Sequence, residues 1–323
     1  MHIPDGFLDA KTVIATTVFS GTGLGTALRQ ARQHLQTREI PLVGLTAAFI
    51  FVAQMLNFPI AGGTSGHLIG ATMAMVLLGP SVAIIVMSSV LIIQAVIFAD
   101  GGLLALGANI FNMAIVAPVS GYIIYQAMRG LLRDTQGMLI SASVASWCTT
   151  VIASVFCAGE LAWSGTAKWN FVFPAMAGIH AIIGIGEGLI TMLVLSAIVK
   201  TRPEVLINNA TQSNRSENTS ALFYGAVIVI GLLLLVAPFA SQLPDGLDRV
   251  AQSLGFETKK IENQGFPTPL KDYRFFGIES PALSTIAAGM CGAGLVSVLS
   301  FFLARVLIPR KRNMNNSPSS IVR

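Results

Sequence analysis

The chain has 323 residues, of which 53% are apolar and 11% are charged, and its formal net charge is +5. Its mean hydropathy of +0.71 excludes a soluble globular or disordered protein and predicts an all-α polytopic membrane protein. The positive charge does not call for a nucleic-acid partner, because the basic residues gather in alternate loops between apolar segments.

The chain starts with Met1-His2-Ile3-Pro4-Asp5-Gly6. In such a start, the Met1 amine, the His2 main-chain nitrogen and the His2 imidazole can close fused five- and six-membered chelate rings on one metal ion. The bulky His2 should prevent removal of Met1, and residues 1–10 lack the basic region of a cleavable signal peptide. We therefore expect the native start to persist. A second interpretation stays open, in which His2 simply follows the start codon.

Nine apolar segments follow and are candidates for membrane spans. They cover residues 11–28, 40–58, 67–79, 81–98, 103–128, 139–163, 171–199, 222–240 and 283–308. The first is rich in Thr and Gly, and the third is short and ends at Gly79-Pro80. The pattern predicts a seven-span bundle followed by a two-span hairpin.

Basic residues indicate the orientation, because they are enriched in cytoplasmic loops. The loops on one side of the predicted bundle hold Arg29, Arg32, Arg38, Arg129, Arg133, Lys200, Arg202, Arg215, Arg305, Arg310, Lys311 and Arg312. The short loops on the other side hold only Lys11 and Lys168. We expect a bacterial inner-membrane protein with its N-terminus outside and its C-terminus in the cytoplasm.

A polar stretch divides the chain into two predicted domains. Residues 1–200 form the first membrane domain, 201–220 a cytoplasmic linker, and 221–323 a two-span accessory domain whose outer loop covers 241–282. That loop contains Pro244-Asp245-Gly246, which repeats Pro4-Asp5-Gly6 from the chain start. The tripeptide is a turn former, so chance can also explain the repeat.

Three further histidines are sorted by the predicted topology. His34 lies in a cytoplasmic loop, where a solvated side chain is expected. His180 and Glu187 are two helical turns apart and share one face of the seventh span. Ionisable groups at this depth face the bundle interior or a cavity, and either a structural His-to-Glu network or a transport role fits this pair.

His67 lies on the same outer side as the chain start and follows the glycine-rich stretch Gly62-Gly63-Thr64-Ser65-Gly66. Irregular backbone of this kind is tolerated near membrane depth where protein or a water-filled cavity surrounds it. One imidazole from His67 would complete a four-nitrogen planar site with the chain start, a geometry that suits Ni(II) and Cu(II). Because the amine and imidazoles must lose protons to bind metal, we expect capture to weaken below about pH 6.

Several motifs together resemble those of the CbiM/NikM metal-transport components. They are Met1-His2-Ile3-Pro4-Asp5-Gly6, Thr64-Ser65-Gly66-His67-Leu68-Ile69-Gly70, Ala108-Asn109-Ile110-Phe111-Asn112-Met113 and the segment from His180 to Leu189. The resemblance covers roughly residues 1–200. The final hairpin, with Pro244-Asp245-Gly246-Leu247, is similar to the accessory component called NikN or the PDGLE domain, which implies a fused NikMN-type protein.

The resemblance implies roles for individual residues. The metal would be bound by Met1, by the amide and imidazole of His2, and by His67. Asn109 would orient an imidazole as a hydrogen-bond partner, or it would join two helices by a hydrogen bond. The name PDGLE gives the accessory motif as Pro-Asp-Gly-Leu-Glu. This chain has Asp248 in place of the Glu, which keeps the negative charge.

The resemblance also implies the partners: a transmembrane coupling subunit and two ATPase subunits of an energy-coupling factor (ECF) transporter. The chain has no Gly-Lys dipeptide, hence no phosphate-binding P-loop of its own. No resident cofactor is expected; the ion is cargo, with nickel favoured by planar nitrogen ligation and cobalt as the alternative. Docking to the coupling subunit would use small-residue faces, either Gly21 with Gly25 or Gly184 with Gly188, although pairs of this kind also serve internal packing.

Two other function classes are less well supported. A secondary divalent-cation transporter typically has several acidic residues at midmembrane depth, whereas Glu187 is the only deeply placed acid here and Glu160 lies near a span end. An intramembrane metalloenzyme would need an H-E-x-x-H helix or an open metal coordination position, and no such motif is present. The sequence therefore predicts a transporter subunit and not an enzyme.

Overall fold

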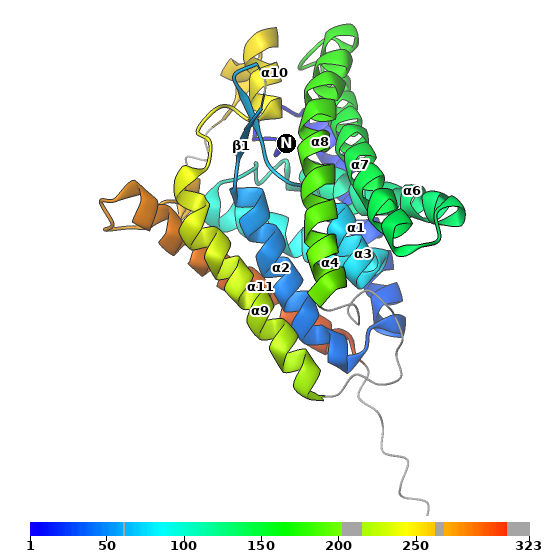
Figure 1. Cartoon of the computed structure of the whole chain (residues 1–323). Helices are drawn as coiled ribbons and strands as arrows, with labels where there is room; N and C mark the ends of the chain where they lie inside the picture. The colour runs from blue at the N-terminus through cyan, green and yellow to red at the C-terminus, as the bar shows by residue number, and fades with distance from the viewer. Residues whose placement is uncertain (61, 202–214, 262–267, 309–323) are drawn as a thin grey trace, which may run out of the picture.

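The computed structural model describes residues 1–60, 62–201, 215–261 and 268–308 (Figure 1). The long helices of its first 201 residues are α1 (Ala10–His34), α2 (Ile40–Met55), α4 (Pro80–Ile93), α6 (Ala117–Leu131), α7 (Thr135–Trp163) and α8 (Trp169–Thr201). Shorter helices are α3 (Ala71–Leu78) and α5 (Leu106–Asn109). The chain is an all-α membrane protein, as the composition predicts.

Two departures from regular helix occur in the bundle. A short antiparallel hairpin, β1 (Phe58–Ile60) and β2 (Thr64–Gly66), follows α2. Two stretches of π-helix, over Gln94–Phe98 and Ile110–Val116, extend α4 and join α5 to α6. In these segments the side chains do not follow the regular α-helical spacing. Turns of this kind are frequent at functional sites.

The accessory part consists of α9 (Arg215–Leu235), α10 (Gly246–Leu254) and α11 (Pro281–Leu307), with a 3-10 turn over Lys271–Tyr273. In Figure 1, α9 and α11 lie beside α2 on one flank of the molecule, and α6, α7 and α8 form the other flank. The linker predicted over 201–220 falls largely on 202–214, outside the described residues. The described helix α9 begins at Arg215, earlier than the predicted span at 222.

Six helices of the described residues are long and apolar enough to cross a membrane. They correspond to the predicted spans over 40–58, 81–98, 103–128, 139–163, 171–199 and 283–308. The segment predicted over 67–79 is wrong as a full span, because α3 has eight residues and is therefore about 12 Å long. It is buried among other helices, which explains how so short a segment is accommodated.

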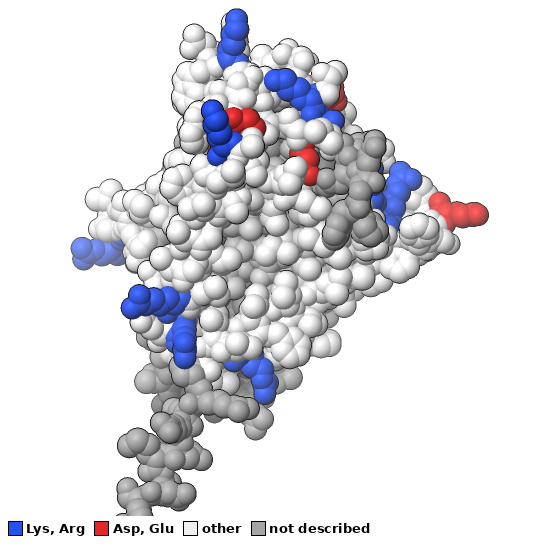
Figure 2. Space-filling view, turned by 180° about the vertical axis from the view of Figure 1, so that it is seen from behind, with Lys and Arg blue, Asp and Glu red and all other residues white. Residues whose placement is uncertain are grey.

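Charge distribution on the surface agrees with a membrane protein. Figure 2 shows Lys, Arg, Asp and Glu mostly near the top and along the margins of one face, and a broad uncharged area in its middle. Large apolar side chains are exposed on the described helices, for example Ile14 on α1 and Leu193 on α8, with 64% and 68% of their surface accessible. Such exposure is stable only where lipid or another protein covers it.

Candidate metal centre

The first residues of the chain lie inside the protein. Met1, His2 and Ile3 are buried. In the view of Figure 1 the N-terminus lies below α10, between the β1–β2 hairpin and α8. The Asn109 side chain holds this segment, because its Oδ1 accepts from the Ile3 amide at 2.8 Å and its Nδ2 donates to the Ile3 carbonyl at 3.0 Å. Gly102 donates its amide to the same carbonyl at 2.9 Å.

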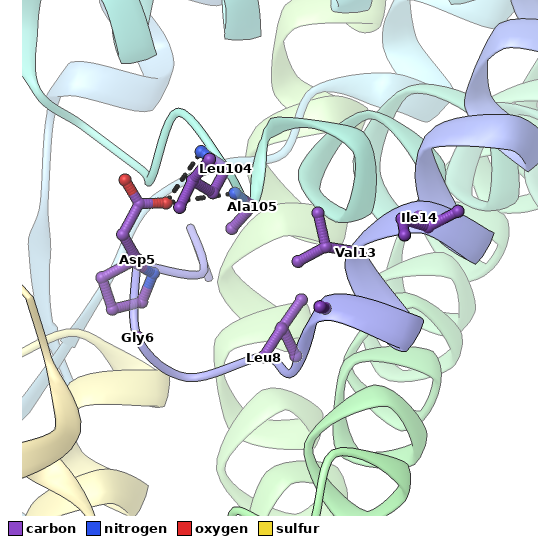
Figure 3. A pocket seen from close by; sticks show the side chains of 9 residues that line it. Asp5, Gly6, Leu8, Val13, Ile14, Leu104 and Ala105 are labelled. Carbon is purple, nitrogen blue, oxygen red and sulfur yellow. Dashed lines mark hydrogen bonds between the residues drawn. The ribbon is translucent and has the colours of Figure 1, made fainter.

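Asp5 anchors the next turn of the chain. Its carboxylate accepts hydrogen bonds from the amides of Leu103, Leu104 and Ala105, at 2.9–3.1 Å. Figure 3 shows the bonds from Leu104 and Ala105. Gly102 is required beside Asp5, since a Cβ atom there would lie 2.0 Å from Asp5 Oδ1. The Pro-Asp-Gly turn at the chain start is therefore fixed by hydrogen bonds and close packing.

A small pocket lies next to this turn but away from the histidines. It has a volume of about 260 Å³, and Leu8, Val13, Ile14 and Leu104 form much of its apolar lining (Figure 3). Asp5 is its charged residue, and all three of the hydrogen bonds that its carboxylate accepts come from backbone amides. The pocket therefore does not offer ligands for a metal ion.

The Met1 amine meets His67 directly. Met1 N lies 2.7 Å from His67 Nε2, and His67 Nδ1 lies 3.0 Å from the Leu68 carbonyl oxygen. A carbonyl only accepts, so Nδ1 carries the proton and the Nε2 lone pair points at the amine. Two nitrogens bound at right angles to one ion, with bonds of about 2.0 Å, lie about 2.8 Å apart. The observed spacing therefore suits neighbouring ligands on a single ion.

His2 completes the cluster. Its ring stacks against that of His67, with centroids 5.0 Å apart and planes 25° apart. His2 Nδ1 lies 3.2 Å from Asp100 Oδ1, and His2 Nε2 lies 3.2 Å from Gln94 Oε1. A six-membered chelate ring uses Nδ1, so a metal ion bound there would replace Asp100 as the partner of this nitrogen.

The main-chain nitrogen of His2 donates no hydrogen bond to any described residue, although its neighbours on both sides do. Buried amides are normally paired. The described residues also contain no group of three or more His, Cys, Asp or Glu side chains that could hold a metal ion. A metal site at this cluster would draw on the imidazoles of His2 and His67 together with main-chain nitrogens, the ligand set predicted from the sequence.

Burial favours the metal-binding form of both rings. It lowers the pKa of His67 to about 3, with the neighbouring amine and His2 acting in the same direction. Burial also lowers the pKa of His2, although Asp100 opposes this shift. Neutral imidazoles keep a free lone pair. Protonation of His67 is therefore not the cause of the loss of binding expected below about pH 6.

Glu187 positions the loop that carries His67. Its carboxylate accepts the amides of Ile69 and Gly70, both at 2.9 Å, and the Thr150 hydroxyl at 3.1 Å. His180 Nδ1 instead lies 2.8 Å from the Met176 carbonyl. Among the described residues, His180 and Glu187 share a helix face without a hydrogen bond between them, so the His-to-Glu network, one of the two interpretations of this pair, is not formed.

Asn109 also has a different role from the one predicted. Both of its side-chain hydrogen bonds to described residues go to the backbone of Ile3 and not to an imidazole. It therefore positions the chain start, one residue after His2. His34, by contrast, is exposed at the end of α1, as expected, with Nδ1 2.9 Å from the Gln30 carbonyl.

Two accessory residues that sequence reasoning did not assign reach the cluster. Asp245 Oδ2 lies 2.8 Å from the Met1 amine, and Tyr273 donates its hydroxyl to Asp100 Oδ2 at 2.6 Å. The amine and His67 more than offset the effect of burial and hold the pKa of Asp245 below its usual range. The repeated Pro-Asp-Gly was the available signal for Asp245, whereas the sequence has no comparable signal for Tyr273.

Comparison with known proteins identifies the family. A family model for the cobalt uptake substrate-specific transmembrane region, CbiM, matches residues 2–205. The chain belongs to the CbiM family. A second model, for the PDGLE domain, matches residues 219–309, so this is a CbiM-family protein fused to an accessory domain.

Relatives of the same length are named as nickel transport proteins. The chain is 36% identical over 313 residues to a putative fused nickel transport protein NikMN of Archaeoglobus fulgidus, covering 94% of this chain and 98% of the relative. It is 28% identical over 322 residues to a probable fused nickel transport protein LarMN of Lactiplantibacillus plantarum, covering 94% and 96%. This CbiM-family chain is therefore a metal-uptake component.

Shorter relatives match the first part alone. A putative cobalt transport protein CbiM of Methanococcus voltae is 32% identical over 225 residues, which cover 67% of this chain and all of the relative. A crystal structure of a transition metal transporter superposes with a TM-score of 0.58 at 32% identity, covering 66% of this chain and all of that one. The CbiM-family chain is accordingly a transport protein and not an enzyme.

Proposed function

We propose that the chain is the substrate-capturing component of an ECF importer for Ni²⁺. The ion would be bound on the outer side by the Met1 amine, the amide and imidazole of His2, and the imidazole of His67. The observation that carries this proposal is the 2.7 Å approach of His67 Nε2 to the Met1 amine, with the His2 ring stacked beside it. Cobalt is the second candidate ion, because the family model is described by cobalt uptake.

Titration of the purified full-length chain with Ni²⁺ and Co²⁺ tests this proposal. We expect Ni²⁺ to bind at least about 10-fold more tightly than Co²⁺, because planar nitrogen ligation favours Ni²⁺ and the stability order runs the same way. Calorimetry in a weakly chelating buffer gives both affinities. Tighter Co²⁺ binding would make cobalt the cargo, and failure of both ions to bind at micromolar concentration would refute a capture site here.

ATP hydrolysis would come from two separate ATPase subunits, linked through a transmembrane coupling subunit. The two glycine pairs considered for that docking have different surroundings. A Cβ atom on Gly184 would lie 2.9 Å from Trp147, and one on Gly188 would lie 2.8 Å from the Ser143 carbonyl, so this pair serves internal packing. A Cβ atom on Gly21 or Gly25 would meet nothing within 4 Å, which leaves this face of α1 open for a partner helix.

Replacing both Gly21 and Gly25 by Leu is expected to reduce copurification of the coupling subunit at least about 10-fold, since Leu side chains keep helices from approaching closely. Ni²⁺ affinity of the isolated chain should not change, because both positions are open. Gly294→Leu on α11 is the matched control, as its surroundings are equally open. Undiminished copurification of the double variant would remove α1 from the docking surface.

A further inference from the structure

Residues 243–261 of the accessory domain lie against the chain start. Ser65, beside His67, donates its amide to the Pro244 carbonyl at 2.8 Å and its hydroxyl to the Leu243 carbonyl at 2.7 Å. Gly246 lies so close to His180 that a Cβ atom there would be 2.8 Å from the ring. The turn that contains Asp245 is thus fixed over Met1, His2 and His67 by contacts on both sides.

More contacts tie the accessory segment to the residues just after Met1. Ile261 donates its amide to the Asp5 carbonyl at 2.9 Å, and Phe256 packs edge-on against Phe7 with ring centroids 5.1 Å apart. Gly6 has φ +92°, and a Cβ atom there would lie 2.1 Å from the Lys259 carbonyl oxygen. Only glycine allows this approach. The chain start and the accessory loop therefore pack closely against each other.

Asp245 makes two contacts with its two oxygens. Oδ1 accepts the Asp248 amide at 2.8 Å and caps the start of α10, and Oδ2 accepts from the Met1 amine at 2.8 Å. Its side chain is 17% exposed. The Met1 amine is the only cationic partner that the described ion pairs give to Asp245. A mostly buried carboxylate is thus aimed at the amine that would bind the metal ion.

A coordinated primary amine uses its lone pair for the metal and keeps two N–H bonds. In the structure the amine is an ammonium group that donates to Asp245 Oδ2. When it loses one proton to solvent and binds the ion, one remaining N–H bond can stay on Asp245 Oδ2, so this hydrogen bond fixes the direction of the lone pair that the metal uses. Hydrogen-bond partners of metal ligands act in this way in other sites. In addition, a divalent ion with one deprotonated amide leaves a charge of +1 in a buried site, which a carboxylate balances.

We propose that Asp245 is a positioning residue of the metal site, supplied by the accessory domain to orient the Met1 amine. This inference rests on the proposed function. The fused accessory domain then contributes directly to ion affinity, and the first domain alone holds an incomplete site. The competing role for Asp245 is structural, as the cap of α10, and the two roles can be separated by substitution.

Asp245→Ser separates them, because Ser is a good helix cap but is too short to reach the amine. Asp245→Asn is a second variant of nearly the same shape. Its side chain has one acceptor oxygen for two donors, the Asp248 amide and the Met1 amine. Asp248→Asn is the matched control, since it removes one negative charge from the same turn without touching the amine. All variants are made in the full-length chain, and Ni²⁺ is the probe.

Asp245→Ser and Asp245→Asn are expected to weaken Ni²⁺ binding about 10- to 100-fold, the range seen when partners of metal ligands are removed. Asp248→Asn should stay within about 2-fold of the unmodified chain. The visible absorption band of bound Ni²⁺ should shift in the Asp245 variants, because Asp245 no longer orients the lone pair of the Met1 amine toward the ion. A capping defect would lower the melting temperature without moving this band.

A second comparison tests whether Asp245 acts through the amine. When extra residues precede Met1, no free amine is present at this position, and Asp245→Ser should then cause no further loss of Ni²⁺ affinity. An equal loss in both backgrounds would overturn the inference, as would Ni²⁺ affinity and absorption in Asp245→Ser identical to those of Asp248→Asn. If the unmodified chain binds no Ni²⁺, the proposed function fails as well, whereas unaffected Asp245 variants overturn this inference alone.

Discussion

Adding a short Gly-Ser-Gly-Ser extension before Met1 is expected to weaken Ni²⁺ binding at least about 100-fold, equivalent to about 2.7 kcal/mol. The extension turns the Met1 nitrogen into a peptide amide, which removes the amine ligand and opens the five-membered chelate ring. It must also enter a buried space, since Met1 is 4% exposed and its nitrogen contacts both His67 and Asp245. Calorimetric titration measures the change in affinity.

A protease that cuts directly before Met1 provides the control, because it restores the native amine in the same protein sample. Recovery of Ni²⁺ affinity after cleavage would assign the loss to the amine and not to misfolding. The same four residues added after Arg323 should have no effect. Ni²⁺ affinity within about threefold of the unmodified chain despite the extension would place the ion elsewhere in the protein.

His67→Ala is expected to weaken Ni²⁺ binding on the order of 100-fold, while leaving residual binding. The substitution removes the lone pair that lies 2.7 Å from the Met1 amine. The three nitrogens of Met1 and His2 remain, with water in the fourth position, so the loss should be smaller than for the N-terminal extension. Titration of the two variants side by side checks this order.

His34→Ala is the matched control for His67→Ala. His34 is exposed, and its Nδ1 contacts only the Gln30 carbonyl among the described residues. Ni²⁺ affinity should therefore be unchanged in His34→Ala. Equal affinities in His67→Ala and the unmodified chain would exclude His67 as a ligand and direct attention to the other residues that surround the amine.

The accessory domain is closely joined to the first domain at the candidate site. Asp245 contacts the amine, and Tyr273 contacts Asp100, which in turn contacts His2. Tyr273 also stacks on Phe98 with ring centroids 4.8 Å apart, at the end of the π-helical turn that carries Gln94. Both imidazole-bearing segments are thus held by groups from beyond residue 240, which gives a physical reason for fusing the two domains in one chain.

The membrane class and the position of most spans follow from local composition. Apolar stretches of about 20 residues cross a bilayer as helices, because the helix satisfies all the backbone hydrogen bonds of a single segment without a partner strand. The length of an apolar segment does not show, however, whether it crosses the membrane or is buried among other helices. The segment that became α3 is apolar but has eight residues, and only the surrounding helices explain why it is stable inside the bundle.

The ligand candidates were also accessible from the sequence by itself. A histidine at position two creates a chelate through covalent geometry, and the glycine-rich stretch before His67 marks the irregular backbone that brings it near. What the tertiary structure decided is the set of partners around these ligands: Asn109 on Ile3, Glu187 on the loop after His67, and Asp245 on the amine. These contacts join residues 106, 118 and 244 positions apart. Hydrogen bonds over such separations arise from helix packing, which no local sequence pattern encodes.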